Sequence, residues 1–95
     1  MFHPEIPPHV AEVTRHFPPD LKRSIKAALR TLCRNPHEGV PLVHELQGLW
    51  KYRVRRFRIV YAVDQKKQAI QVMAIGHRRD VYDEVTERVR RNKKW

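Results

Sequence analysis

The sequence predicts an α+β fold in which an N-terminal helical hairpin packs on a small antiparallel sheet of three to four strands, followed by a C-terminal helix. Apolar residues recur at helical spacing in the first third of the chain and again near its end. Between residues 50 and 63 they instead alternate with cations and small residues, as strands require. This order of helices, then strands, then a helix favours a fold in which the helices and the sheet form separate layers. The length of 95 residues suits one domain, residues 1–95.

The first two elements are expected to be helices joined by a Pro-Pro turn. Residues 8–17 form a short helix, because proline suits the first helical position and Pro18 cannot continue it. Residues 21–34 form a longer helix, which ends at Asn35 because a residue before proline avoids the helical region. Its apolar stripe is spaced i, i+4, i+7, i+8 and i+11, at Leu21, Ile25, Ala28, Leu29 and Leu32. The single cysteine, Cys33, is expected to be a buried structural thiol.

A β-hairpin and a central strand are expected next. Large apolar residues alternate with cations over residues 50–54, and an alternating pattern begins again over residues 57–63. The shift in register between the two runs marks a tight turn. Residues 42–46 are expected to be extended, and the mostly apolar run 69–75 favours a central strand. Residues 81–91 are expected to form the last helix, before a frayed basic end. Helices are expected to cover one sheet face, which leaves the other open or covered by a partner.

The charge of the chain points to polyanionic partners. Twenty Lys and Arg against ten Asp and Glu give a formal charge of +10, which favours nucleic acid or an acidic protein. No apolar run approaches the ~20 residues of a membrane span, and the N-terminus lacks a signal-peptide pattern, so a cytoplasmic protein without a membrane partner is expected. Six scattered histidines without a close ligand pair argue against a metal site.

A cationic sheet face is the feature left to carry chemistry. Lys51, Arg53 and Arg58 can project to one side of the hairpin, and His77 and Arg78 close the following strand. Such a cluster could hold a phosphodiester and stabilise charge developing on it. The pattern alone fits a solvated charged surface equally well.

Three motifs in this order resemble the RelE/ParE superfamily of toxins from bacterial and archaeal toxin–antitoxin systems. They are carried by "ELQGLWKYRVRRFRIVYAVD" and "VMAIGHRRDVYDE", and the similarity extends upstream through "IPPHVAEVTRHFPPDLKRSIKAALRTLCRNPHEG". The pattern looks RelE-like. The resemblance implies a toxin that enters the ribosomal A site and cuts mRNA by 2′-hydroxyl attack, without metal or cofactor. It also implies a cognate antitoxin that neutralises the chain.

The resemblance also implies site residues. Lys51 and Arg53 match two basic residues on the active face, Arg58 and Arg78 match its arginines, and Tyr82 matches a tyrosine that stacks on a base. His77 joins this catalytic set because imidazole titrates near neutral pH, so His77 or Lys51 would transfer protons. Further RNA contacts are expected from the neighbouring cations Arg55, Arg56 and Arg79.

The chain also departs from the RelE pattern. Lysine is common in the family where this chain has Arg53 and His77. The family's first strand should lie near residues 2–6, yet Pro4 interrupts it, so that strand is an edge, shortened or absent. Two other functions remain open. One is a ParE-type, non-enzymatic inhibitor of DNA gyrase, and the other is a basic RNA-binding domain without toxicity.

Overall fold

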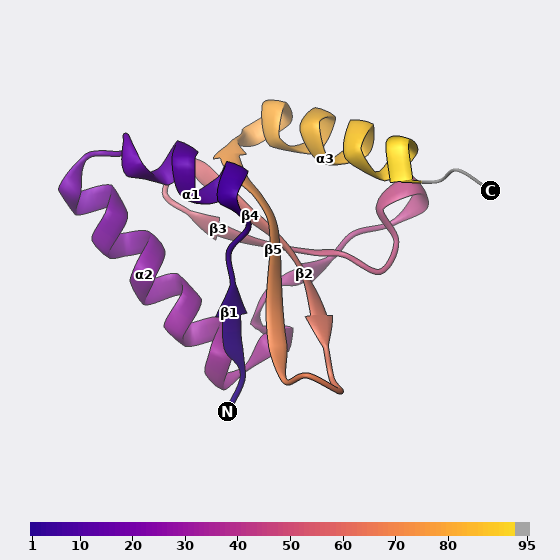
Figure 1. Ribbon diagram of the computed structural model, residues 1–95, viewed down its shortest axis with the longest axis horizontal. Helices are drawn as coiled ribbons and strands as arrows, with labels where there is room; N and C mark the ends of the chain where they lie inside the picture. The colour runs from indigo at the N-terminus through magenta and orange to yellow at the C-terminus, as the bar shows by residue number, and fades with distance from the viewer. Residues whose placement is uncertain (93–95) are drawn as a thin grey trace.

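Five strands form one mixed sheet with helices on both sides (Figure 1). The computed structural model describes residues 1–92, except the side chains of Arg78, Arg79, Arg91 and Asn92. The spatial strand order is β1-β5-β4-β3-β2, with β1 parallel to β5 and every other pair antiparallel. The strands are β1 (His3–Glu5), β2 (Val40–Pro41), β3 (Trp50–Val54), β4 (Phe57–Asp64) and β5 (Ala69–His77).

The α+β class is confirmed, but the prediction of an antiparallel three- to four-stranded sheet is wrong. The structure adds β1 in parallel at one edge and β2 at the other. Both strands are too short to show alternation, since β1 has three residues around Pro4 and β2 has two. Residues 42–46 are not a strand, because β2 ends before them and His44–Leu46 form a 3₁₀ turn.

The helices begin and end close to where the sequence predicts. They are α1 (Pro8–Arg15), α2 (Pro19–Arg34) and α3 (Arg78–Asn92), and proline occupies the first turn of both α1 and α2. The last helix starts three residues earlier than expected, directly after β5. The basic end predicted to fray spans residues 90–95, but residues 90–92 belong to α3, and residues 93–95 lie outside the described part of the chain. Within residues 1–92, no helix is long and apolar enough to cross a membrane.

The main core lies between the sheet and the helical hairpin. From α2 it receives Leu21, Ile25, Ala28, Leu32 and Cys33, all buried. From the sheet it receives the buried side chains of Val54, Ile59, Tyr61, Ile70, Val72 and Ile75. Trp50, Tyr52 and Phe57 pack against this cluster, which confirms that the aromatic side of the β3–β4 hairpin faces the core. Burial also raises the pKa of the Cys33 thiol, as expected for a structural cysteine.

The opposite face of the sheet is covered in part by α3, which corrects the expectation that all helices share one face. Val81 and Val85 of α3 are buried against Val60 and Ala74. A β-bulge in β5 leaves Met73 without a partner in β4, and both Met73 and the following Ala74 pack in the cluster beneath α3 before the alternation resumes. The Met73 carbonyl accepts a hydrogen bond from His9 Nε2 on α1 at 3.2 Å. Figure 1 shows α3 extending away from the end of β5, with α1 and α2 on the other side.

Candidate functional site

Lys51, Arg53 and Arg58 form a cationic face on the side of the sheet that α3 partly covers. The register pairs Arg53 directly with Arg58, and Arg58 in turn with Gly76 of β5. Lys51 pairs with Val60, whose side chain packs under α3. Like charges placed opposite one another in a sheet are destabilising, so this arrangement costs stability unless an anion binds it.

Intramolecular carboxylates do not neutralise the cationic face. Among the described side chains, none of its three cations has an ion-pair partner. Arg53 Nε donates to the Arg55 carbonyl at 3.0 Å, and Arg58 Nη1 donates to the Phe57 carbonyl at 3.2 Å. A guanidinium has five N–H donors, so each arginine is oriented by one hydrogen bond and keeps donors for a ligand.

Tyr82 of α3 lies next to the cationic face, where its ring contacts Lys51. Its ring centroid lies 5.8 Å from Lys51 Nζ, within the range of a cation–π interaction. Tyr82 is half-buried and packs against the small cluster beneath α3. The packing of α3 on the sheet therefore brings together two site residues that are 31 positions apart (82 − 51) in the sequence.

A polar cavity opens at the tip of the β3–β4 hairpin. It measures about 380 Å³ and is lined by Arg53, Arg56, Arg58 and His77. Three guanidinium groups around one cavity provide charge and bidentate donors, the combination that binds phosphate oxygens well. The N-terminal end of α3 follows His77 directly, and the helix dipole there also favours an anion.

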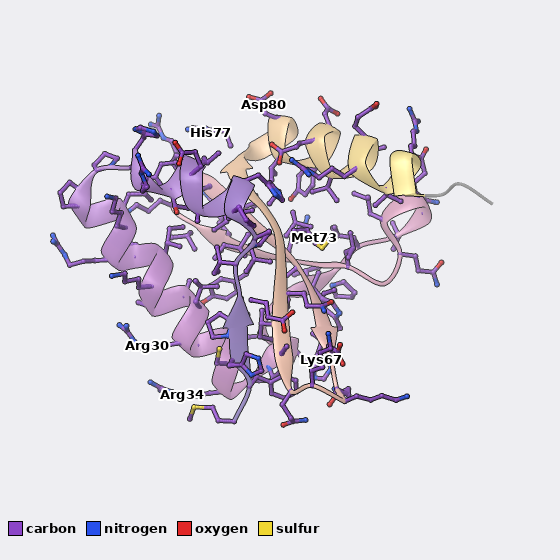
Figure 2. The ribbon with its side chains drawn as sticks, in the orientation of Figure 1. Arg30, Arg34, Lys67, Met73, His77 and Asp80 are labelled. Carbon is purple, nitrogen blue, oxygen red and sulfur yellow. The ribbon has the colours of Figure 1, made fainter. Side chains whose placement is uncertain are left out.

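His77 is the last residue of β5 and reaches the cavity lined by Arg53 and Arg58 from the other side of the sheet. It pairs with Phe57 in the register, and the two ring centroids are 4.4 Å apart. Phe57 packs against the main core, so register places His77 on that side of the sheet while it still lines the cavity. Figure 2 shows His77 at the end of the sheet near α1 and the start of α3.

The remaining predicted RNA-binding cations do not all join this site. Arg55 lies in the tight turn with φ 56° and makes an ion pair with Asp20 of α2 at 3.0 Å. That hydrogen bond holds the pKa of the Asp20 carboxyl below its usual value. Arg56 lines the cavity. Arg78 and Arg79 form the first turn of α3, and their side chains lie outside the described part of the structure.

A buried contact between β4 and the segment after α2 supports β3, the strand that carries Lys51. The Tyr61 hydroxyl donates to the Pro36 carbonyl at 2.7 Å, and burial raises the pKa of Tyr61 to about 12. A Cβ added to Gly39 would collide with this hydroxyl and with the Lys51 carbonyl oxygen. The segment after α2 can therefore approach β3 closely only because residue 39 is glycine. No short-range pattern signals a contact across such sequence distances.

The arrangement can bind a phosphodiester through several guanidinium donors and can stabilise charge that develops on its oxygens. Lys51 and His77 are the groups near the arginines that can gain and lose protons, since arginine stays protonated. Among the described side chains, no three His, Cys, Asp or Glu gather as a metal site would need.

Comparison with known proteins places these features in a family. A family model described as the ParE toxin of the type II toxin–antitoxin system parDE matches residues 9–82. This range includes Lys51, Arg53, Arg58, His77 and Tyr82. The chain is also 30% identical over 59 residues to Toxin RelG of Mycobacterium tuberculosis, covering 61% of this chain and 68% of RelG.

Solved structures share the fold at low sequence identity. A mutant of E. coli toxin RelE in the free state superposes with a TM-score of 0.76 at 21% identity, covering 92% of this chain and 96% of RelE. A chain of the toxin–antitoxin complex RelBE2 from Mycobacterium tuberculosis gives a TM-score of 0.74 at 22% identity, covering 81% of this chain and 98% of that chain. The sequence match and the shared fold agree. The chain belongs to the ParE/RelE toxin family of type II toxin–antitoxin systems.

Proposed function

We propose that this toxin is a ribosome-dependent endoribonuclease that cuts mRNA in the ribosomal A site and so inhibits translation in the cytoplasm. The single observation that carries the proposal is the pairing of Arg53 with Arg58, next to Lys51, without a carboxylate partner among the described residues. Such a cluster is unfavourable in the free protein and favourable around a phosphodiester, so it indicates an anionic substrate.

The proposed reaction is transesterification within the RNA. A base removes the proton of a ribose 2′-hydroxyl, and its oxygen forms a bond to the adjacent phosphorus. The bond from phosphorus to the 5′-oxygen breaks, and an acid returns a proton to that oxygen. The products are a 2′,3′-cyclic phosphate and a 5′-hydroxyl. Arg53 and Arg58 would stabilise the added negative charge, a role that bound metal ions fill in other nucleases.

Lys51 is better placed than His77 to transfer the first proton. It shares a face with Arg53 and Arg58 and is oriented by the Tyr82 ring, whereas the His77 ring lies against Phe57. We therefore expect His77→Gln to retain the shape of the pH–rate profile and most of the rate. Loss of one limb of the profile would instead assign the proton transfer to His77.

RNA binding is proposed to extend beyond the scissile phosphate. Tyr82 can stack on a base with the ring face that is turned away from Lys51, and Arg56 can contact a neighbouring phosphate in the cavity. Arg78 is proposed to add to the catalytic cations and Arg79 to RNA contacts, on the basis of the family resemblance. Arg55 is proposed to contact RNA only if its ion pair with Asp20 opens.

The deciding experiment programs ribosomes with a defined mRNA and compares wild type with Arg58→Ala. We expect wild type to cut once within the A-site codon, leaving cyclic phosphate and 5′-hydroxyl ends. Arg58→Ala should cut about 10²–10³-fold more slowly, the usual loss when one transition-state donor is removed. A 2′-deoxy nucleotide at the cut site should abolish cleavage, because the nucleophile is missing. Cleavage that persists on the deoxy substrate would exclude this mechanism.

A second candidate is inhibition of DNA gyrase, favoured by the match to the ParE toxin model. It predicts inhibition of gyrase supercoiling by the purified chain, with translated mRNA left intact. The full set of cations on the active face favours the ribonuclease, because non-enzymatic inhibition does not require them. Gyrase inhibition that survives Arg58→Ala, together with uncut mRNA, would establish the second candidate.

An antitoxin is the proposed protein partner. Solved relatives include a toxin–antitoxin complex from Mycobacterium tuberculosis and one from E. coli. The formal charge of +10 means that an acidic partner would gain electrostatically on binding.

A further inference from the structure

The tip of the β3–β4 hairpin, where the polar cavity opens, contacts the connection between α1 and α2. Phe17 of this connection packs on Phe57 of β4, with ring centroids 5.0 Å apart. Asp20, in the first turn of α2, accepts a hydrogen bond from Arg55 Nη1 at 3.0 Å. Residues 17–20 therefore fix the hairpin tip at two points, one apolar and one charged.

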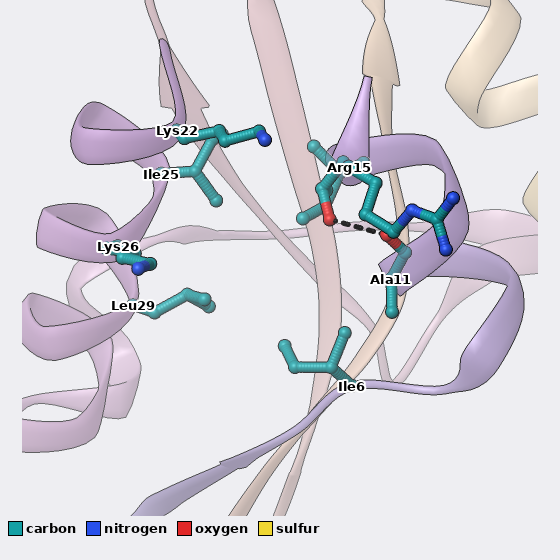
Figure 3. Close-up of a pocket in the computed structure, with 9 residues that line it drawn as sticks. Ile6, Ala11, Arg15, Lys22, Ile25, Lys26 and Leu29 are labelled. Carbon is teal, nitrogen blue, oxygen red and sulfur yellow. Dashed lines mark hydrogen bonds between the residues drawn. The ribbon is translucent and has the colours of Figure 1, made fainter. Parts of the chain in front are cut away.

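The backbone that carries Asp20 is itself held in place. Pro18 and Pro19 precede it with fixed φ angles, and Pro19 is the first residue of α2. Leu21 and Ile25 of α2 are buried in the main core. Figure 3 shows Ile25 on the side of α2 that faces the apolar groove of about 370 Å³ between α1 and α2. Because the interior of a protein is closely packed, Asp20 offers the hairpin a fixed point of attachment.

Arg55 has a backbone conformation that is unfavourable for arginine. Its φ is 56°, in the left-handed region, which glycine enters at no steric cost and residues with a Cβ enter at a cost. Glycine at this position would therefore form the turn more easily. Conformations of this kind persist where the surrounding structure holds them. The ion pair with Asp20 is a contact that can hold this one, and it uses the arginine side chain that glycine lacks.

The turn that Arg55 forms also orients Arg53. The Arg55 carbonyl oxygen accepts a hydrogen bond from Arg53 Nε at 3.0 Å. Arg53 stands opposite Arg58 in the register, so the two charges repel each other and tend to separate. The hydrogen bond opposes this tendency at Nε and leaves the terminal N–H groups of Arg53 for a phosphate. A movement of the Arg55 carbonyl would move the Arg53 guanidinium with it.

We propose that Asp20 is a positioning residue for cleavage: its ion pair with Arg55 holds the turn whose carbonyl oxygen orients Arg53 in the polar cavity. The role in cleavage rests on the proposed function, whereas the control of the Arg53 orientation does not. Asp20 is not among the residues that line the cavity, so it acts through Arg55 and touches neither the RNA nor the reacting atoms.

Direct contact of Arg55 with RNA is the competing explanation, and it gives the opposite result for Asp20→Asn. If Asp20 positions Arg53, loss of the ion pair releases the turn, and the transition state loses a well-oriented donor, so kcat falls. If Arg55 binds RNA when its ion pair opens, loss of Asp20 makes that cation available, so the ribosome–mRNA complex binds more tightly and KM falls. A cleavage assay at several concentrations of programmed ribosomes separates the two constants.

The assay uses the full chain and compares Asp20→Asn with Arg55→Gln. Each should lower kcat about three- to fivefold and leave KM unchanged, because an exposed ion pair shifts a local equilibrium by at most about this factor. The double variant should be no slower than either single variant, since both changes remove the same contact. A lower KM in Asp20→Asn with a higher KM in Arg55→Gln would overturn the proposal, and so would an unchanged kcat in both.

Glu12→Gln is the matched control. It removes the same charge as Asp20→Asn and also breaks an exposed ion pair, the one that Glu12 makes with Arg15 at 3.4 Å within α1. Because this pair does not involve the hairpin, kcat should stay within about 1.5-fold of wild type. A loss equal to that of Asp20→Asn would overturn the proposal, because it would show an effect of net charge rather than of position.

An NMR measurement tests the positioning without cleavage. The N–H signal of Arg53 Nε reports its hydrogen bond to the Arg55 carbonyl, because a bonded N–H exchanges with water more slowly than an open one. We expect this exchange to be at least about threefold faster in Asp20→Asn than in wild type or Glu12→Gln. Equal exchange in all three proteins would overturn the inference even if the chain cuts mRNA. If wild type cuts no mRNA, the proposed function fails, and the exchange rates still decide whether Asp20 orients Arg53.

Discussion

The two faces of the sheet differ in how much apolar surface they bury and in where they hold charge. Beneath α1 and α2, twelve buried residues form the main core, including Tyr61 and Leu32 at 0% exposure. Beneath α3, four buried residues among the described side chains form a small cluster. Most of the free energy of folding should therefore come from the hairpin side, since it scales with the apolar area removed from water.

The charges follow the opposite distribution. Lys51, Arg53 and Arg58 all lie on the α3 side, where the apolar cluster ends and solvent reaches the strands. A cation needs water or an anion around it, so a sheet can carry such a site only on the face that its core leaves partly uncovered. One face thus provides stability and the other can tolerate an arrangement that costs stability in the free protein.

A change in the main core should have the largest effect on stability. Leu32→Ala removes a fully buried side chain, and we expect it to lower the free energy of unfolding by about 2–5 kcal/mol. Urea denaturation followed by circular dichroism measures this loss. Val85→Ala is the comparison on the other face, and it should mainly increase hydrogen exchange in α3. Equal global destabilisation by the two changes would show that both faces contribute alike.

The converse change should reduce activity without reducing stability. Arg58→Ala removes one of two facing arginines, so we expect unfolding in urea at the same or a higher concentration than wild type. Its rate of ribosome-dependent cleavage should fall by about 10²–10³-fold. A markedly less stable variant would mean that Arg58 stabilises the fold, and that the cations of this face do not lower the stability of the free protein.

Gly39→Ala should affect both faces together. The added Cβ would collide with the Tyr61 hydroxyl in the main core and with the Lys51 carbonyl oxygen on β3. We expect a loss of about 1–3 kcal/mol in stability, as for other overpacked sites, and slower cleavage through displacement of Lys51. Val40→Ala, at an exposed neighbouring position, is the control and should be close to wild type in both measurements.

Tyr82 distinguishes a base-stacking residue from one that only anchors α3. If stacking is its role, Tyr82→Phe should cleave within about twofold of wild type, whereas Tyr82→Ala should lose a stacking contribution of about 1–3 kcal/mol in transition-state binding. Thermal unfolding of the same two variants gives the structural contribution. A loss of cleavage in Tyr82→Ala that follows its loss of folded protein would assign Tyr82 to packing.

The ion pair between Asp20 and Arg55 should give the smallest effect on stability, and one that disappears in acid. Because the pKa of Asp20 is lowered in the folded protein, its contribution is present above the ordinary aspartate value and is lost as pH falls through the folded pKa. Asp20→Asn should therefore be slightly less stable than wild type at pH 6, and the two should converge as pH falls through the lowered pKa of the folded Asp20 carboxyl. A difference that stays constant with pH would indicate that charge is not its cause.

Local patterns predicted the helical hairpin, the turn at Arg55 and Arg56 and the aromatic core side of β3 and β4. They also predicted that Lys51, Arg53 and Arg58 share one face, because alternation along a strand is a property of the backbone itself. They did not predict β2, since two residues carry no period, and the three residues of β1 were expected only from the family resemblance, as an edge or shortened strand. They also placed His77 at the end of the strand beside the cations, and His77 lines the same cavity as Arg53 and Arg58, but no local pattern showed that its ring lies against Phe57.

The sequence by itself determined the three helices, the strands β3, β4 and β5 and which side of the β3–β4 hairpin is cationic, because these follow from the spacing of neighbouring residues. Only the tertiary structure decided that α3 covers the cationic side and carries Tyr82 to Lys51, that Arg55 pairs with Asp20, and that α2 borders an apolar groove. These contacts join residues far apart in the chain. They depend on how whole elements pack, and packing is set by the total area buried rather than by any local pattern.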